Sequence, residues 1–173
     1  MENKNNTLIL LQQSLNVAGL ATHLAEPTEA VPVYQLRVLL ESKVAGEEVV
    51  CEIMLLPELP EPAVLQLFVP FPFFVEFERI GELARFLHMV NNAMPLHGFG
   101  MMESSREVYF RQLLPFRQDA LDHQLVIESF FVFDASIGLF VETIRQLAVS
   151  EITFDQATEE LQRLLHQLNA RTD

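Results

Sequence analysis

The chain of 173 residues has a single cysteine, Cys51, and no tryptophan. One cysteine excludes an internal disulfide and a zinc site built from cysteines, and it fits a reducing compartment. Basic residues are also few, because 11 Lys and Arg stand against 24 Asp and Glu and give a net charge of −13. No basic run is present to neutralise phosphates, so we expect neither nucleic acid nor an anionic membrane surface as a partner.

The segment from residue 63 to residue 75 is membrane-like in composition, but polar residues and prolines break it up. Gln66, Pro70 and Pro72 interrupt it, and it is shorter than the roughly 20 apolar residues of a spanning helix. The first 20 residues do not form a signal peptide, because polar residues divide their apolar ones. We therefore expect a cytoplasmic protein without a membrane span.

Catalytic and cofactor motifs of useful specificity are lacking as well. The five histidines are scattered, and no pair has the i,i+4 spacing of a helical metal site. No GxSxG motif is present, and Ser104 and Ser105 fit a hairpin turn without any reaction. We therefore expect no enzymatic activity, no cofactor and no bound metal.

Half of the residues are apolar, which is enough for one well-buried core and predicts a single domain over residues 1–173. Helical spacing and strand alternation of the apolar residues predict the elements. The elements of the first part are a helix over residues 7–18 and strands over 34–41, 49–56 and 63–69. The sequence PELPEP at 57–62 is expected to form the turn before the third strand, and Pro70 and Pro72 are expected to end that strand.

The second part of the chain is predicted to contain three helices and a hairpin. They are a helix over 78–94, hairpin strands over 97–103 and 107–114, a long helix over 119–148 and a helix over 153–169. Thr153 and Gln156 form a capping-box pair at the start of the last helix, which we regard as a C-terminal helical extension at 153–170. The predicted fold is α+β, an antiparallel sheet with helices packed on it in the order α-β-β-β-α-β-β-α-α.

The run ELARFLHMVNNAMPLHGFGMMESSREVYFRQLLPF, from Glu82 to Phe116, carries a family resemblance. The positions that carry it are Val90, Asn91, Gly98, Gly100, Tyr109 and Arg111. This pattern resembles the YbjN family, whose fold is similar to that of type III secretion chaperones. The resemblance covers about residues 7–148 and implies an α+β domain that associates with itself or with another protein, with no known chemistry.

The segment QLFVPFPFFVEFE, residues 66–78, contains five of the fourteen phenylalanines, and we expect its part after residue 69 to be an irregular link. Two interpretations stay open. The rings fold back on the second and third helices as a satellite core, or they form an exposed patch joined to the second face of the sheet. The candidate partner-binding residues on the second interpretation are Val50, Met54, Val64, Phe68, Phe71, Phe73 and Phe74.

These observations favour a non-enzymatic protein-binding function, chaperone-like or regulatory. The partner is expected to be a second copy in a homodimer or an extended segment of another protein. The alternative is a carrier of a small apolar ligand, with Phe and Met residues lining a cavity. A third hypothesis is a hydrolase, which requires a pocket in which His97 or His123 meets a carboxylate.

Overall fold

The computed structural model describes residues 2–56, 62–117 and 120–170. Its helices are α1 (Glu2–Val17), the 3-10 helix η1 (Phe77–Arg79), α2 (Ile80–Ala93), α3 (His123–Ala148) and α4 (Phe154–Asn169). Its strands are β1 (Thr22–Ala25), β2 (Gln35–Val44), β3 (Glu47–Leu55), β4 (Ala63–Phe74), β5 (Phe99–Met102) and β6 (Glu107–Phe116). The described strands form one antiparallel sheet in the order β1-β2-β3-β4-β6-β5. The fold is therefore α+β, as predicted.

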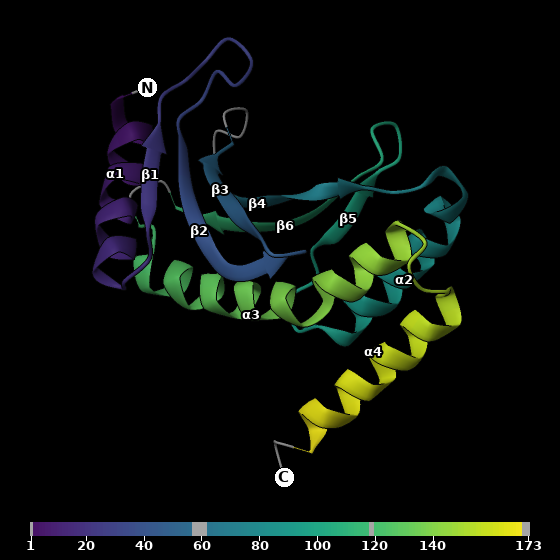
Figure 1. Cartoon of the computed structure of the whole chain (residues 1–173). Helices are drawn as coiled ribbons and strands as arrows, with labels where there is room; N and C mark the ends of the chain where they lie inside the picture. The colour runs from purple at the N-terminus through teal and green to yellow at the C-terminus, as the bar shows by residue number, and fades with distance from the viewer. Residues whose placement is uncertain (1, 57–61, 118–119, 171–173) are drawn as a thin grey trace.

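The helices lie on one side of the curved sheet and along its β1 edge, as Figure 1 shows. We call the helix-covered face the inner face and the opposite one the outer face. Strand residues alternate between the two faces, and the apolar residues of the inner face are buried with the helices in one core. In β3, for example, Cys51 and Ile53 are fully buried while Val50, between Val49 and Cys51, is exposed.

The predicted element order is wrong by one strand. Residues Thr22–Ala25, which fall in the expected polar link after the first helix, form β1 and pair with residues 35–38 of β2. Four residues are too few for a recognisable alternation, and this strand depends on long-range hydrogen bonds to β2. The observed order is α-β-β-β-β-α-β-β-α-α.

The prediction that Pro70 and Pro72 end the third strand is also wrong, because β4 continues to Phe74. The register of β3 with β4 runs from Leu55 opposite Leu65 to Glu52 opposite Phe68, so the part of β4 after Phe68 extends beyond this pairing. The Val64 carbonyl accepts from the Leu56 backbone N–H at 3.0 Å, so the backbone groups of Val64 and of every second residue after it in β4 point to the β3 side. Residues 70 and 72 have the same orientation, so their missing N–H groups lie on the side that β3 has left. The expected PELPEP turn at 57–62 falls largely outside the described residues.

The long helix α3 is the main helical contribution to the core. Phe130, Phe133, Ile137 and Ile144 are fully buried, whereas Leu125, near the start of the helix, is exposed. By length and composition alone α3 could cross a membrane. The core helix of a soluble protein passes the same test, so these two properties are weak evidence for a membrane span. Its buried residues pack in the same core as the sheet.

A buried carboxylate on α3 fixes an irregularity in β2. The register of β2 with β3 shifts between Leu39 and Lys43, and the backbone N–H groups of Glu41 and Ser42 donate to the Asp134 carboxylate at 3.0 and 3.3 Å. The Ser42 hydroxyl donates to the same carboxylate at 2.5 Å. Backbone groups that lose ladder partners at the bulge are thus satisfied by α3.

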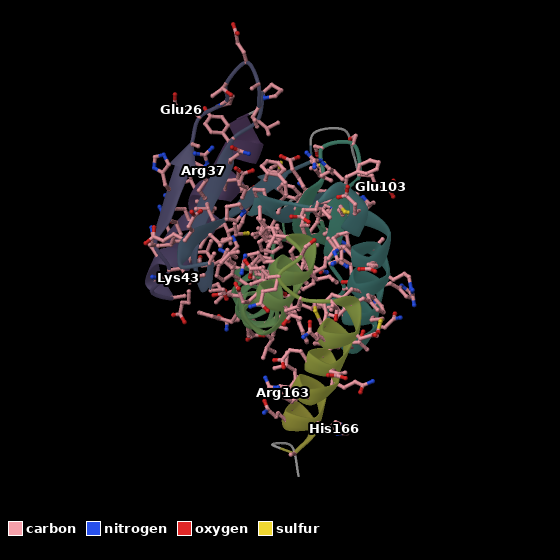
Figure 2. All side chains as sticks on the ribbon, turned by 45° about the vertical axis from the view of Figure 1, so that its right-hand side comes forward. Glu26, Arg37, Lys43, Glu103, Arg163 and His166 are labelled. Carbon is pink, nitrogen blue, oxygen red and sulfur yellow. The ribbon has the colours of Figure 1, made fainter. Side chains whose placement is uncertain are left out.

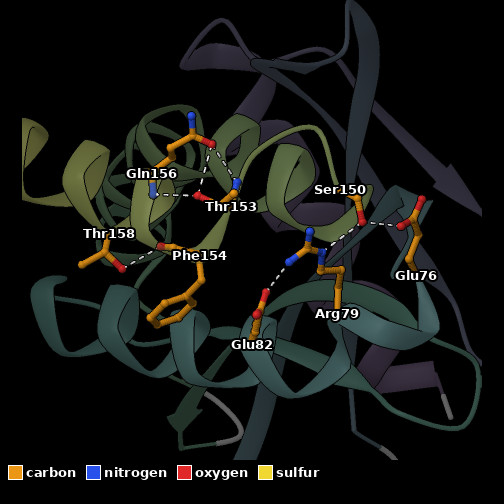
Figure 3. A network of polar contacts seen from close by, with 8 residues as sticks. All are labelled: Glu76, Arg79, Glu82, Ser150, Thr153, Phe154, Gln156 and Thr158. Atoms are coloured by element: carbon orange, nitrogen blue, oxygen red, sulfur yellow. Dashed lines mark hydrogen bonds and ion pairs between the residues drawn. The ribbon is translucent and has the colours of Figure 1, made fainter.

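The start of α2 is held against the turn between α3 and α4, as Figure 3 shows. The Glu76 backbone N–H donates to the Ala148 carbonyl at 2.9 Å, and Glu76 also accepts from the Ser150 hydroxyl. Arg79 donates to Ser150 at 3.0 Å and pairs with Glu82 at 2.5 Å. The contacts of Glu76 and Arg79 with Ala148 and Ser150 join segments more than 70 residues apart in the sequence.

The predicted capping box of the last helix is confirmed. Thr153 accepts from the Gln156 backbone N–H at 3.3 Å, and Gln156 accepts in return from the Thr153 N–H at 2.9 Å. Leu161 of α4 is buried, while Arg163 and His166 lie on the part of the helix that projects from the body of the molecule (Figure 2).

Candidate protein-binding surface

The outer face of the sheet is a partly apolar surface on the side away from the helices. Paired residues share a face, so Arg37, Glu52, Phe68 and Arg111 form one row across β2, β3, β4 and β6. The apolar residues around this row are Leu39, Val50, Met54, Pro70, Tyr109 and Leu113. The exposed fractions of Val50 and Leu113 are 38% and 43%, so this face is partly apolar and accessible to solvent.

Three of the seven candidate binding residues lie together on the outer face. Val50 and Met54 follow one another on the exposed side of β3, and Phe68 lies opposite Glu52 between them. Phe74 is 59% exposed at the end of β4, at the margin of the same face. Val64 belongs to the other end of β4 and is buried. The structure thus brings Val50, Met54 and Phe68 into one surface.

Phe71 and Phe73 lie in the core, with exposed fractions of only 5% and 7%. Their ring centroids are 5.9 Å apart, and the Phe71 ring stacks on Phe99 at 6.0 Å. Phe99 in turn makes an edge contact of 4.9 Å with Phe110. For these two side chains the structure corresponds to the interpretation as core, and a partner that docks on the outer face does not reach them.

The centre of the outer face is aromatic and basic. The ring centroids of Phe68 and Tyr109 are 5.5 Å apart, and the Arg111 guanidinium carbon lies 5.8 Å from the Tyr109 centroid. Tyr109 and Arg111 carry part of the family resemblance, but they are not among the partner-binding residues predicted from the sequence. The alternation in β6 is the signal that could have placed them, because buried Val108 and Phe110 put Tyr109 and Arg111 on the other face.

The acidic residue in the central row is already engaged. The Glu52 carboxylate accepts from the Gln35 amide at 3.1 Å and lies 4.0 Å from the Arg37 guanidinium. Arg37 also donates to the Gln35 side-chain oxygen at 3.3 Å, and Gln35 is buried. Glu52 thus has partners within the sheet.

Asn91 and two glycines position the aromatic centre. Asn91 Oδ1 accepts from the backbone N–H groups of Gly98 and Phe99 at 3.1 and 3.0 Å, and its amide donates to the Phe99 carbonyl at 2.9 Å. A Cβ on Gly100 would come within 2.5 Å of the Tyr109 ring. The end of α2 therefore fixes β5, and a residue without a side chain makes room for Tyr109.

The described histidines form no metal cluster, and one of them contacts a serine. His123 Nδ1 lies 2.8 Å from the Ser14 hydroxyl, which is also 3.1 Å from the Leu10 carbonyl. The tautomer of His123 decides which of the two side chains donates. No group of three or more metal-ligating side chains occurs among the residues described, and neither His97 nor His123 pairs there with a carboxylate.

Cys51 and a surface depression on α2 are two further features of the described residues. Burial raises the pKa of the Cys51 thiol far above its ordinary value, which keeps it protonated and unreactive. An open depression on α2 is lined by Ala84, Arg85, His88 and Met89. It is a surface feature of one helix and differs from the Phe- and Met-lined cavity that a ligand carrier would need.

No protein-family model matches this chain, and no curated protein matches it.

Proposed function

We propose that this protein is a non-enzymatic protein-binding module, chaperone-like or regulatory, that receives a partner on the outer face of its sheet. The observation that supports this proposal is an accessible group of apolar and aromatic residues on the outer face of the sheet. The inner face of the same sheet already forms the core. Val50, Met54, Phe68 and Leu113 contribute to that group. Contiguous exposed apolar surface of this kind is typical of interaction sites.

An extended protein segment fits this surface better than a compact small ligand. A strand presents alternate side chains to one face at about 6.6 Å spacing, which suits the rows of a sheet. Each partly exposed side chain of the size of Val or Leu that becomes buried contributes about 1 kcal/mol or less. Several such contacts are needed for stable binding, and the outer face supplies them across β2, β3, β4 and β6.

The YbjN resemblance gives the proposal secondary support. Its quoted positions Asn91, Gly98, Gly100, Tyr109 and Arg111 gather where α2 ends and where β5 pairs with β6. Association with another protein, or with a second copy, is what that resemblance implies. We also propose a secretion-chaperone-like fold, a cytoplasmic location and a homodimer.

The test is a capture experiment with a charged outer face. The full chain, a Val50→Glu, Leu113→Glu double variant and a control Val17→Glu variant are used as bait in lysate of the native host. Val17 lies on α1 and is 90% exposed, so the control places one added negative charge at a different surface. We expect one protein to be retained by the wild type and the control, to be lost with the double variant, and to bind the wild type again when purified.

Further measurements separate the remaining outcomes. Circular dichroism must show all three proteins folded, and sedimentation equilibrium shows whether the wild type binds a second copy through the same face. A partner that binds all three baits equally would contradict docking on the outer face. Mass spectrometry of organic extracts that reveals a bound apolar compound, without any captured protein, would favour the ligand carrier instead.

A further inference from the structure

The outer face carries charges of both signs, because Glu48 shares it with Glu52, Arg37 and Arg111, and one of its cations lacks an acidic partner among the described residues. Arg79, Arg145 and Arg163 on the helical side each pair with a carboxylate at 2.5 to 2.8 Å. Arg111 is exposed on the outer face, and within residues 2–56, 62–117 and 120–170 it has no carboxylate at ion-pair distance. An acidic protein thus keeps an unneutralised cation beside its apolar surface.

The neighbours of Arg111 hold the cation where a docked chain would pass. Its guanidinium lies over the Tyr109 ring, and Phe68 occupies the paired position on β4. Glu52, the acid in the same row, is engaged by Gln35 and Arg37. Glu107 is four residues along β6, about 13 Å away at the rise of a strand, and accepts from Ser105.

A guanidinium on an aromatic ring retains its outward N–H groups for a planar anion. Binding of an apolar chain beside it removes water, which strengthens its attraction to a carboxylate and raises the cost of leaving it unpaired. A lysine or arginine placed at the same point would be repelled. The local charge therefore selects for an acid, although the net charge of −13 favours basic molecules at long range.

We propose that the occupant of the outer face is an extended segment of another protein that carries an Asp or Glu side chain, with apolar residues two positions before or after it. The carboxylate pairs with Arg111, and the apolar side chains pack on Phe68, Val50 and Met54. This inference rests on the proposed function and names the chemistry of its partner.

The experiment is a selection from a random dodecapeptide phage library on four forms of the full chain. They are the wild type, Arg111→Glu, the outer-face double variant Val50→Glu, Leu113→Glu and the control Arg85→Glu. Arg85 is an exposed arginine that lies over the Phe154 ring at 4.7 Å on the helical side, so it matches Arg111 in chemistry at another place. Each form is first checked for folding by circular dichroism.

We expect the wild type and Arg85→Glu to enrich apolar peptides with one Asp or Glu, and Arg111→Glu to enrich Lys or Arg at that position. One enriched peptide is then synthesised with its acid and with the amide counterpart. Fluorescence polarisation should show about fivefold weaker binding of the amide peptide to the wild type, and no difference for Arg111→Gln.

The outcomes distinguish this inference from the function on which it rests. Peptides that depend on Val50 and Leu113 but show no acidic preference, or keep it in Arg111→Gln, would overturn the inference alone. Identical selections on the wild type and the double variant would overturn both. Displacement of the probe by decanoate at the same affinity as by the peptide would identify a free fatty acid as the occupant and also overturn the inference.

Discussion

At the scale of single residues, polar side chains fix the irregular parts of this protein. Asp134 joins α3 to the bulge in β2, and Asn91 joins α2 to β5, each through two backbone N–H groups. Asp134 accepts from N–H groups at the bulge in β2, and Asn91 accepts from N–H groups at the start of the edge strand β5. A side chain in this role is hard to substitute, because its loss leaves buried donors without partners.

Replacing Asp134 by alanine is expected to lower the free energy of unfolding by about 2–4 kcal/mol, since three donors lose a charged acceptor. Asp134→Asn keeps one acceptor oxygen and should lose less. Urea unfolding followed by circular dichroism measures both. Glu128→Ala, an exposed change on the same helix, is the control, and an equally small effect of Asp134→Ala would show that the bulge does not need the carboxylate.

The two glycines beside β6 should differ in their tolerance of a methyl group. A Cβ on Gly98 meets the buried Phe110 ring at 2.6 Å and the Arg111 carbonyl at 2.9 Å, whereas a Cβ on Gly100 meets only the outer part of the Tyr109 side chain. Gly98→Ala is expected to cost about 1–3 kcal/mol from overpacking, and Gly100→Ala less. Thermal unfolding of the two variants tests this order of stability loss. A larger loss of stability for Gly100→Ala than for Gly98→Ala would contradict it.

At the scale of elements, an ion cluster stabilises the junction of α3 and α4. Arg145 pairs with Glu142 at 2.8 Å and with Glu151 at 2.5 Å. Hydrogen bonds from its guanidinium hold the pKa of both carboxyls below their ordinary value, and the pKa of Arg145 is raised in turn. A lowered pKa in the folded state stabilises the protein above the unfolded value and loses this effect as pH falls.

Arg145→Gln should therefore be less stable than the wild type at pH 7, and the difference should shrink as pH falls from about 5 through the lowered carboxyl pKa values. Urea midpoints at pH 7, 5 and 3.5 measure this. The effect is small because both carboxylates are about half exposed. Arg85→Gln serves as a control for loss of a guanidinium that lies over a ring, and a pH-independent difference for Arg145→Gln would exclude this origin.

The periodicity of apolar residues predicted the long helices and strands, but it missed features that depend on pairing between distant strands. The capping box of α4 follows from Thr153 and Gln156 alone, because its contacts are local. The strand β1 needs β2 to exist, and the passage of β4 through Pro70 depends on where β3 ends. Alternation is local, so it placed Val50, Met54 and Phe68 on one face of the sheet, as the structure has them. It could not show that Phe71 and Phe73 turn to the core, because the path of β4 beyond residue 69 was not predicted.

At the scale of the whole molecule, the division into two faces separates stability from recognition. The inner face of the sheet and the helices share one core, so a substitution there acts first on folding. The outer face contributes little to that core, so its residues can change with little effect on the free energy of unfolding. Tests of binding are therefore best made at Val50, Leu113 and Arg111, where the folded state is retained.

The end of the pairing between β3 and β4 also bears on how this protein avoids aggregation with other copies of itself. The free side of β4 after Phe68 would be an edge on which a strand of another copy could grow into an aggregate. Pro70 and Pro72 remove two donors from that edge. We expect Pro70→Val, Pro72→Val to fold and yet to form thioflavin-positive fibrils sooner at equal concentration, whereas equal lag times would assign the prolines no such role. The two prolines thus protect the aromatic end of β4 from pairing with a strand of another copy.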